Sequence, residues 1–149
     1  MAEISSAEDL SRCGLSARRA LGIVHPMKFT ETDRGAGNLI DAYGAEGIRV
    51  RGRIHTTGLA LTVAELLAPW GPATIAELAP GHLDPVLALR PELVLLGTGP
   101  VQIFPDPEIH LTLARAGIGL EVMDTGAACR TYNILVSEGR RVVAALLPL

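Results

Sequence analysis

Aromatic residues, cysteine and lysine are scarce in this chain of 149 residues. Aromatic residues make up 3% of it, whereas hydrophobic residues of all kinds make up 48%, so its core must be mainly aliphatic. The two cysteines, Cys13 and Cys129, have no metal-binding spacing and are too few for a disulfide framework. We therefore expect a cytoplasmic protein with reduced thiols, no metal site and no cofactor.

Long apolar runs and a strong charge of one sign are also absent. No run reaches the roughly 18 residues that a membrane-spanning helix needs, and the start lacks the layout of a signal peptide. The net charge of −3 argues against a nucleic-acid-binding surface. Lys28 is the single lysine among 13 basic residues, and this preference for arginine is typical of GC-rich bacterial genomes.

The start of the chain carries few structural signals. Residues 1–25 are expected to form an N-terminal extension, either a flexible tether or a docking arm for a partner. His25 precedes Pro26, which favours extended backbone and marks a boundary. Residues 26–149 are then expected to form a single domain, because their number suits one hydrophobic core.

Short apolar pieces separated by turn signals occupy residues 38–63. The pieces at 39–43, 48–50 and 54–61 predict a meander of antiparallel hairpins. Arg49, Arg51 and Arg53 alternate with other residues here, so we expect three guanidinium groups on one face of these strands. That face is either solvated or a surface for an acidic ligand or a partner protein.

Four apolar runs in the second half predict short strands, at residues 73–78, 93–96, 118–123 and 142–147. Helix-start signals lie between them. Asp84 and Asp106 each precede a proline, as an N-cap precedes the first helical position, and Asp124 can accept from the amide of residue 126 or 127. Gly117 and Gly139 are placed to end the second and third helices. This alternation predicts an open α/β sheet with right-handed crossovers.

Two loops with glycines follow neighbouring strands of that sheet. The candidate crevice that they form consists of Gly97, Thr98, Gly99, Asp124, Thr125, Gly126 and Arg130. Because the carboxyl ends of parallel strands share one sheet edge and a helix begins there, the crevice is expected to bind a small anion weakly. The loops lack the spacing of a dinucleotide site or a P-loop. Turn and cap chemistry alone also accounts for these residues.

No set of catalytic residues is recognisable. Cys129 lies near the start of the third helix beside Arg130, which favours a thiolate, but no histidine is close in sequence. The alternative is that Cys129 packs as a small core residue, and we expect this one. Tyr132 is expected on the flank of the same helix.

Three stretches carry a resemblance to a known family: LVLLGTG at residues 93–99, GIGLEVMDTGAACRTYNILVSEGRRV at 117–142, and ETDRGAGNLIDAYGAEGIRV at 31–50. Together they resemble the Mth-type family of small uncharacterised proteins, with this chain as a bacterial member. The resemblance spans roughly residues 27–147, and DTGAACRTYN is its most specific part.

The resemblance implies a three-layer α/β domain with a central mixed sheet of about five strands and an N-terminal β-hairpin portion. It also implies an antiparallel last strand, whereas alternation alone predicts a parallel one. A mitochondrial relative assists assembly of respiratory complex I, so the resemblance implies a protein partner. It supplies no catalytic residues.

Two functions are therefore compatible with the sequence. The first is a non-catalytic binding or assembly module, related to the assembly of respiratory complexes. The second is a small-ligand-binding protein or enzyme that uses the crevice, with Thr98, Asp124 and Arg130 as its polar groups. We favour the first, because the candidate residues do not form an acid–base pair.

Overall fold

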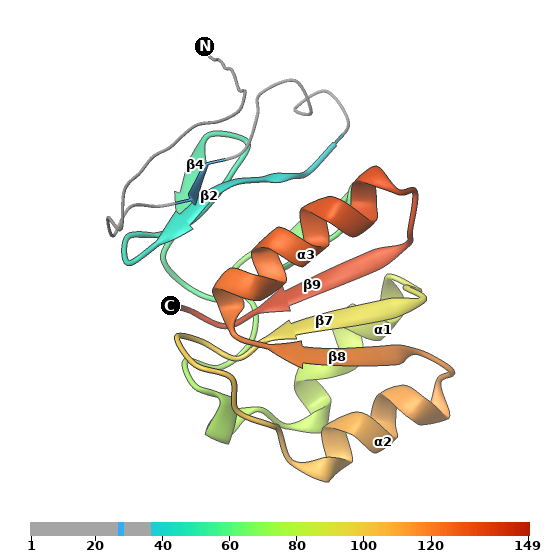
Figure 1. Cartoon of the computed structure of the whole chain (residues 1–149). Coiled ribbons are helices and arrows are strands. Elements are labelled where there is room, and N and C mark those ends of the chain that lie inside the picture. The colour runs from blue at the N-terminus through green and yellow to red at the C-terminus, as the bar shows by residue number, and fades with distance from the viewer. Residues whose placement is uncertain (1–26, 29–36) are drawn as a thin grey trace.

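Two β-sheets and three α-helices make up the part of the chain that the computed structural model describes, residues 27–28 and 37–149 (Figure 1). The expected extension over residues 1–25 lies outside these ranges. Sheet A has the order β1-β2-β3-β4, and its strands are β1 (Met27–Lys28), β2 (Ile40–Gly44), β3 (Gly47–Val50) and β4 (Arg53–His55). It is antiparallel throughout, as the hairpin signals predict.

Sheet B is the central mixed sheet, with the order β6-β5-β9-β7-β8. Its strands are β5 (Leu59–Leu61), β6 (Leu66–Leu67), β7 (Leu93–Gly97), β8 (Gly119–Met123) and β9 (Val142–Leu146). The helices are α1 (Asp84–Ala88), α2 (Pro107–Arg115) and α3 (Thr125–Ser137), and two 3₁₀ turns, η2 (Ile75–Glu77) and η3 (Pro80–Leu83), precede α1.

The direction of the last strand corrects an expectation. β9 runs parallel to β7, as strand–helix alternation predicts, and antiparallel only to β5. Helix α3 carries the chain from the end of β8 back across the sheet, so β9 begins at the same sheet edge as β7. The antiparallel orientation implied by the family resemblance is therefore wrong with respect to β7.

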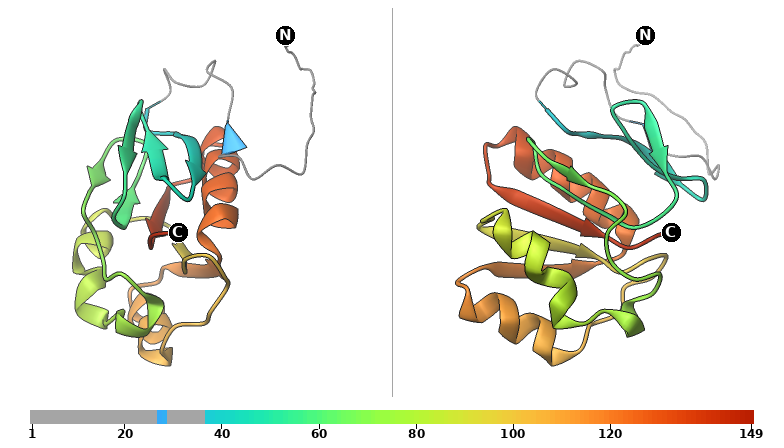
Figure 2. Two further views of the ribbon diagram at one scale, coloured as in Figure 1. Left: turned by 90° about the vertical axis from the view of Figure 1, so that its left-hand side faces the viewer. Right: turned by 180° about the vertical axis from the view of Figure 1, so that it is seen from behind.

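Sheet B is the middle of three layers. Helix α3 and sheet A cover one face, and α1 and α2 cover the other (Figures 1 and 2). Alternate residues of β9 enter the two cores: Val143 and Ala145 pack on the side of α1 and α2, while Val142, Ala144 and Leu146 pack on the side of α3. Burial of both faces explains why β9 is an uninterrupted apolar run.

Two sequence predictions in this region fail for identifiable reasons. Residues 73–78 do not form a strand, because Ile75 and Leu78 are both buried and their spacing of three suits the 3₁₀ turn η2. The expected piece at 54–61 divides into β4 and β5, which belong to different sheets. The chain passes between them at Gly58, where a Cβ would lie 2.4 Å from the Trp70 carbonyl oxygen.

The starts of α2 and α3 follow the local signals, whereas the expected cap at Asp84 is wrong: Asp84 is the first residue of α1, and Leu83 occupies the N-cap position without a side-chain cap bond. Asp106 accepts from Glu108 N at 2.9 Å and Asp124 accepts from Ala127 N at 2.8 Å, so both act as N-caps. Gly117 and Gly139 have φ values of 74° and 82°, the left-handed conformation that ends a helix. Within the described residues, no helix is both long and apolar enough to cross a membrane.

Candidate functional site

The two glycine-containing loops meet at one edge of sheet B, as the sequence predicts. Gly99 N donates to Thr125 Oγ1 at 2.9 Å, and Thr125 N donates to the Gly99 carbonyl at 2.9 Å. Thr98 N donates to the Met123 carbonyl at 2.9 Å, which extends the pairing of β7 with β8. The loops therefore bond directly to each other.

The polar groups proposed to face a ligand are occupied by the protein itself. Thr98 is only 4% exposed; its hydroxyl donates to the Val101 carbonyl at 2.6 Å and accepts from Ile103 N at 3.1 Å. The Thr125 hydroxyl donates to the Leu147 carbonyl at 2.8 Å. The Thr98 hydroxyl is therefore buried and organises the turn after β7.

The glycines of these loops allow close packing of α3. A Cβ on Gly97 would lie 2.9 Å from the Thr125 Cα, and one on Gly126 would lie 2.9 Å from Cε1 of Tyr43. Any larger residue would force the first turn of α3 away from β7 or from sheet A. An anion in the crevice, as the sequence predicts, would have to displace these protein groups, and their bonds within the protein disfavour such binding.

Arg130 connects α3 to sheet A. Its guanidinium donates to the hydroxyl of Tyr43, and its Cζ lies 5.9 Å from the centre of the Tyr43 ring. This combines a hydrogen bond with a cation–π contact. Arg130 therefore interacts with the hairpin sheet at the position where the sequence suggested a ligand contact.

The three hairpin arginines do not share one face. Arg51 lies in the turn after β3 with a φ of 51°, and its Nε donates to Asn38 Oδ1 at 2.7 Å. Arg49 pairs across the hairpin with Ile54, whereas Arg53 pairs with Val50. Because paired residues share a face and successive residues alternate, Arg49 and Arg53 emerge on opposite faces. The expected common face is wrong; a partner surface that uses any one of them stays a prediction.

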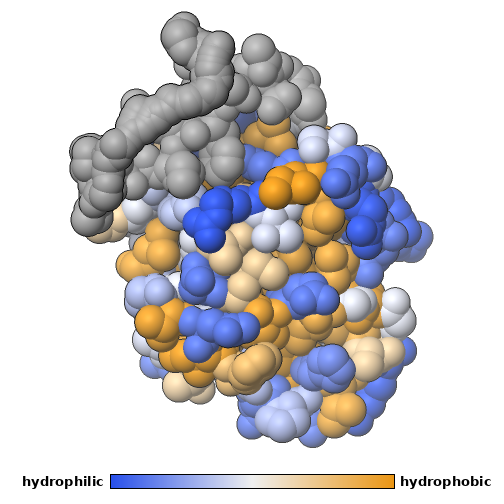
Figure 3. Space-filling view, viewed as in Figure 1, coloured by the Kyte–Doolittle hydropathy of each residue, from blue (hydrophilic) through white to orange (hydrophobic). Residues whose placement is uncertain are grey.

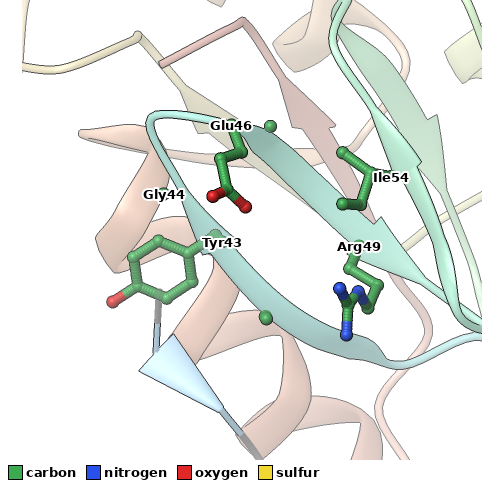
Figure 4. Close-up of a pocket in the computed structure, with 7 residues that line it drawn as sticks. Tyr43, Gly44, Glu46, Arg49 and Ile54 are labelled. Atoms are coloured by element: carbon green, nitrogen blue, oxygen red, sulfur yellow. The ribbon is translucent and has the colours of Figure 1, made fainter. Parts of the chain in front are cut away.

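Arg49 lines a small pocket of about 40 Å³ in sheet A (Figure 4). The side chains of Glu46 and Ile54 border the same pocket, while the Tyr43 ring points outward toward α3. The volume admits little more than a water molecule. This pocket is too small for a substrate.

Two side chains in the DTGAACRTYN stretch have roles that sequence reasoning missed. Tyr132 is fully buried, and its hydroxyl donates to the Asn38 carbonyl at 2.7 Å. Asn133 accepts from Ile40 N at 3.0 Å and donates to the Ile40 carbonyl at 2.9 Å, as a neighbouring strand would. The expectation that Tyr132 lies on the helix flank is therefore wrong. Spacing along α3 predicts which residues share a side, but not which remote backbone groups they bind.

Cys129 packs in the core between α3, sheet A and sheet B, as expected. It has no exposed surface, and this burial raises the pKa of its thiol to about 12, so it stays protonated at neutral pH. Within residues 27–28 and 37–149, no three or more His, Cys, Asp or Glu residues are grouped to hold a metal ion.

Surface features that the sequence did not indicate lie elsewhere. The apolar loop, residues 101–104, follows β7 and exposes Val101 by 58%, Ile103 by 45% and Phe104 by 74%. Figure 3 shows hydrophobic residues reaching the surface between hydrophilic ones on this side of the molecule. A second feature is a pocket of about 380 Å³ that is lined partly by arginines. It lies near the starts of β7 and β9, at the opposite end of these strands from the glycine loops.

A family model described as "Protein of unknown function (DUF498/DUF598)" matches residues 40–147. The chain belongs to this family. A solved structure of a Bordetella pertussis protein, described as an Mth938-like domain, has a TM-score of 0.68 and 35% identity; the match covers 82% of this chain and 92% of that one. The resemblance to the Mth-type family is thus confirmed.

Relatives with descriptive names include a membrane protein and an assembly factor. The "13 kDa major membrane protein" of Francisella tularensis is 41% identical over 73 residues, which are 49% of this chain and 59% of the relative. The "NADH dehydrogenase [ubiquinone] 1 alpha subcomplex assembly factor 3" of Xenopus tropicalis is 30% identical over 120 residues, which are 79% of this chain and 65% of the relative. The chain thus spans less than two thirds of either relative.

Proposed function

We propose that this protein is a non-catalytic binding module that assists the assembly of a respiratory complex. The observation that carries the proposal is the similarity to a protein named as an NADH dehydrogenase assembly factor, which extends over 79% of this chain. In the chain itself, three polar residues of the most specific motif bond to Tyr43 and to the remote backbone of Asn38 and Ile40: Arg130, Tyr132 and Asn133. They attach α3 to sheet A.

The apolar loop and strand β8 supply a surface that suits a protein partner. β8 lies at the edge of sheet B and is bonded on one side, to β7. Gly119 N and the Met123 carbonyl point toward β7, so the backbone groups of Leu120 and Val122 point outward. The Gln102 side chain covers one of them by donating to the Val122 carbonyl at 2.9 Å. An extended segment of a partner can pair with this edge while Ile103 and Phe104 contact its side chains.

Deletion of the gene in its own host tests the assembly role. We expect less fully assembled NADH dehydrogenase on native gels and lower NADH:ubiquinone oxidoreductase activity in membranes. The parent gene should restore both. Normal assembly in the deletion strain would contradict the proposal.

Variants of the apolar loop distinguish a loss of partner binding from a loss of stability. Val101→Ser with Phe104→Ser should fail to restore assembly although the purified protein keeps its thermal stability, because both side chains are already in water. Ile134→Ser on α3 is the matched control, since Ile134 is 56% exposed and lies away from this loop. If the loop variant restores assembly as well as the control variant does, the apolar loop is not part of the partner surface.

A cytoplasmic location remains our expectation, which fractionation of the same strains can test.

A further inference from the structure

The pocket opposite the glycine loops combines apolar walls with a basic rim. Val136 at the end of α3, Val142 at the start of β9, and Leu89 and Pro91 before β7 contribute apolar lining. Arg90, Arg140 and Arg141 line the same pocket. Its volume of about 380 Å³ is within the range of small-molecule sites.

The charges of the rim do not cancel. Arg140 Nε pairs with Glu92 Oε2 at 3.0 Å, and this bond holds the pKa of Glu92 below its ordinary value. Glu92 also accepts from the backbone N of Arg141 at 3.1 Å, which fixes the start of β9. Glu92 does not line the pocket itself, and Glu65 is the carboxylate of the lining. Three guanidinium groups of the rim are thus offset by Glu65 and by the neighbouring Glu92, and this small excess suits a monovalent anion better than a phosphate dianion.

Arg90 is the most unusual residue of the rim. It follows α1 with a φ of 53°, a left-handed conformation that glycine supplies after both α2 and α3. An arginine at such a position costs about 1 kcal/mol relative to glycine. Arg51 has a similar φ, but its side chain bonds to Asn38. Among the residues that the structure describes, the Arg90 guanidinium makes no hydrogen bond or ion pair, so its donors are available to a ligand in the pocket.

The Arg141 guanidinium lies beside Arg90. Its Nη1 donates to the Arg90 carbonyl at 3.3 Å, a long bond that leaves most of its donors free for another acceptor. Two guanidinium groups next to one apolar wall can hold a carboxylate from two directions.

We infer that this pocket binds a carboxylate attached to an apolar body, with Arg90 and Arg141 holding the carboxylate and Val136 and Val142 contacting the body. This site is separate from the apolar loop and does not depend on the assembly role. Free amphipathic acids and an Asp or Glu next to an apolar residue in a partner polypeptide offer the same chemistry.

Amide shifts of the ¹⁵N-labelled chain test the inference, with hexanoate as the probe. Hexanoate at millimolar concentration should shift the amides of Ala64, Gly139 and Arg141 in a saturable way. Neutral hexanamide and short acetate should bind at least about threefold more weakly, because each lacks one of the two contacts. Hexanamide binding as tightly as hexanoate would overturn the proposal.

Charge variants assign the binding to the rim. Arg90→Gln and Arg141→Gln should each weaken hexanoate binding by about three- to fivefold, and Glu65→Gln should strengthen it. Arg115→Gln, an exposed arginine on α2, is the matched control and should change nothing. Unchanged binding in Arg90→Gln and Arg141→Gln, with the rest of the spectrum intact, would show that the rim is not used.

Two peptides distinguish the sources of the carboxylate. If an acetyl-Leu-Glu-amide peptide binds more tightly than hexanoate, and the corresponding Leu-Gln peptide does not, then the carboxylate belongs to a partner polypeptide. Tighter binding of hexanoate identifies a free acid. Binding of none of these probes would contradict the inference.

Discussion

The side chain of Asn133 bonds to the backbone of Ile40 in β2 in the way that a neighbouring strand would. Its amide makes both hydrogen bonds that a neighbouring strand would make to Ile40, at 3.0 and 2.9 Å. This occurs where the pairing of β2 with β3 shifts register, between Ile40 and Ala42. A side-chain amide presents a donor and an acceptor on the same side, so the Asn133 amide satisfies both backbone groups of Ile40 at once.

Asn133→Ala should lower the free energy of unfolding by about 2–3 kcal/mol, because it leaves the buried N–H and C=O of Ile40 unpaired. Urea unfolding followed by circular dichroism measures the change. Ser137→Ala on the same helix is the control, since the Ser137 hydroxyl donates to the nearby Ile134 carbonyl in an exposed position. Its effect should stay within about 0.5 kcal/mol. If the two variants lower the free energy of unfolding equally, the bonds between Asn133 and Ile40 contribute little to stability.

At the scale of the elements, the loop after β7 is organised by Thr98. Thr98→Val keeps the shape of the side chain but removes the acceptor of Ile103 N and the donor to the Val101 carbonyl. We expect a loss of about 1–2 kcal/mol in unfolding free energy and broadened amide signals over residues 99–104. An unchanged midpoint and spectrum would contradict this role.

The same labelled protein tests the predicted crevice. Phosphate at millimolar concentration should leave the amides of Gly99 and Thr125 unshifted, since both already donate within the protein. Saturable shifts of these two amides in the parent, reduced in Thr98→Val, would instead support anion binding there.

Elements defined by local chemistry were predictable from sequence. Asp106 and Asp124 cap helices and Gly117 and Gly139 end them, because these residues act on backbone groups a few positions away. The strand expected around Ile75 is a 3₁₀ turn instead, since a short apolar run suits either element equally well and only the position of the core decides.

The residue contacts of the candidate site were less predictable from sequence than the elements. Thr98 and Arg130 are of the expected type and near the expected edge, but what they bond to depends on contacts that no local pattern encodes.

At the scale of the whole molecule, α3 packs against both sheets: it covers one face of sheet B and lies beside sheet A (Figure 2). Cys129, Ala128 and Tyr132 contact the core residues of sheets A and B in one cluster. The thiol of Cys129 becomes accessible only when this cluster opens, so its reactivity reports on the attachment of sheet A.

Cys129 should therefore react slowly with a thiol reagent at neutral pH in the folded protein and rapidly in urea, because the reacting form is the thiolate and burial raises its pKa to about 12. Mass spectrometry of the labelled chain measures the rate, with Cys13 as the internal reference. Asn133→Ala should speed labelling of Cys129 and Ser137→Ala should not. Rapid modification of Cys129 in the native parent would instead indicate a reactive nucleophile.

The bonds between α3 and β2 join residues that leave the ribosome at different times. Asn133 and Ile40 are separated by 93 positions in the chain. At about 5–20 residues per second, the interval between their synthesis is roughly 5–20 s. The hairpins of sheet A can form within microseconds of emerging. Their inner face, with Ile40, Ile48 and Val50 each at most 1% exposed in the finished fold, is not completely covered until α3 has been made, because α3 residues belong to the same core cluster. For those seconds the nascent chain presents a partly covered apolar sheet that chaperones or neighbouring nascent chains can bind, so we expect translation speed between β4 and α3 to affect how much of this protein reaches its folded state.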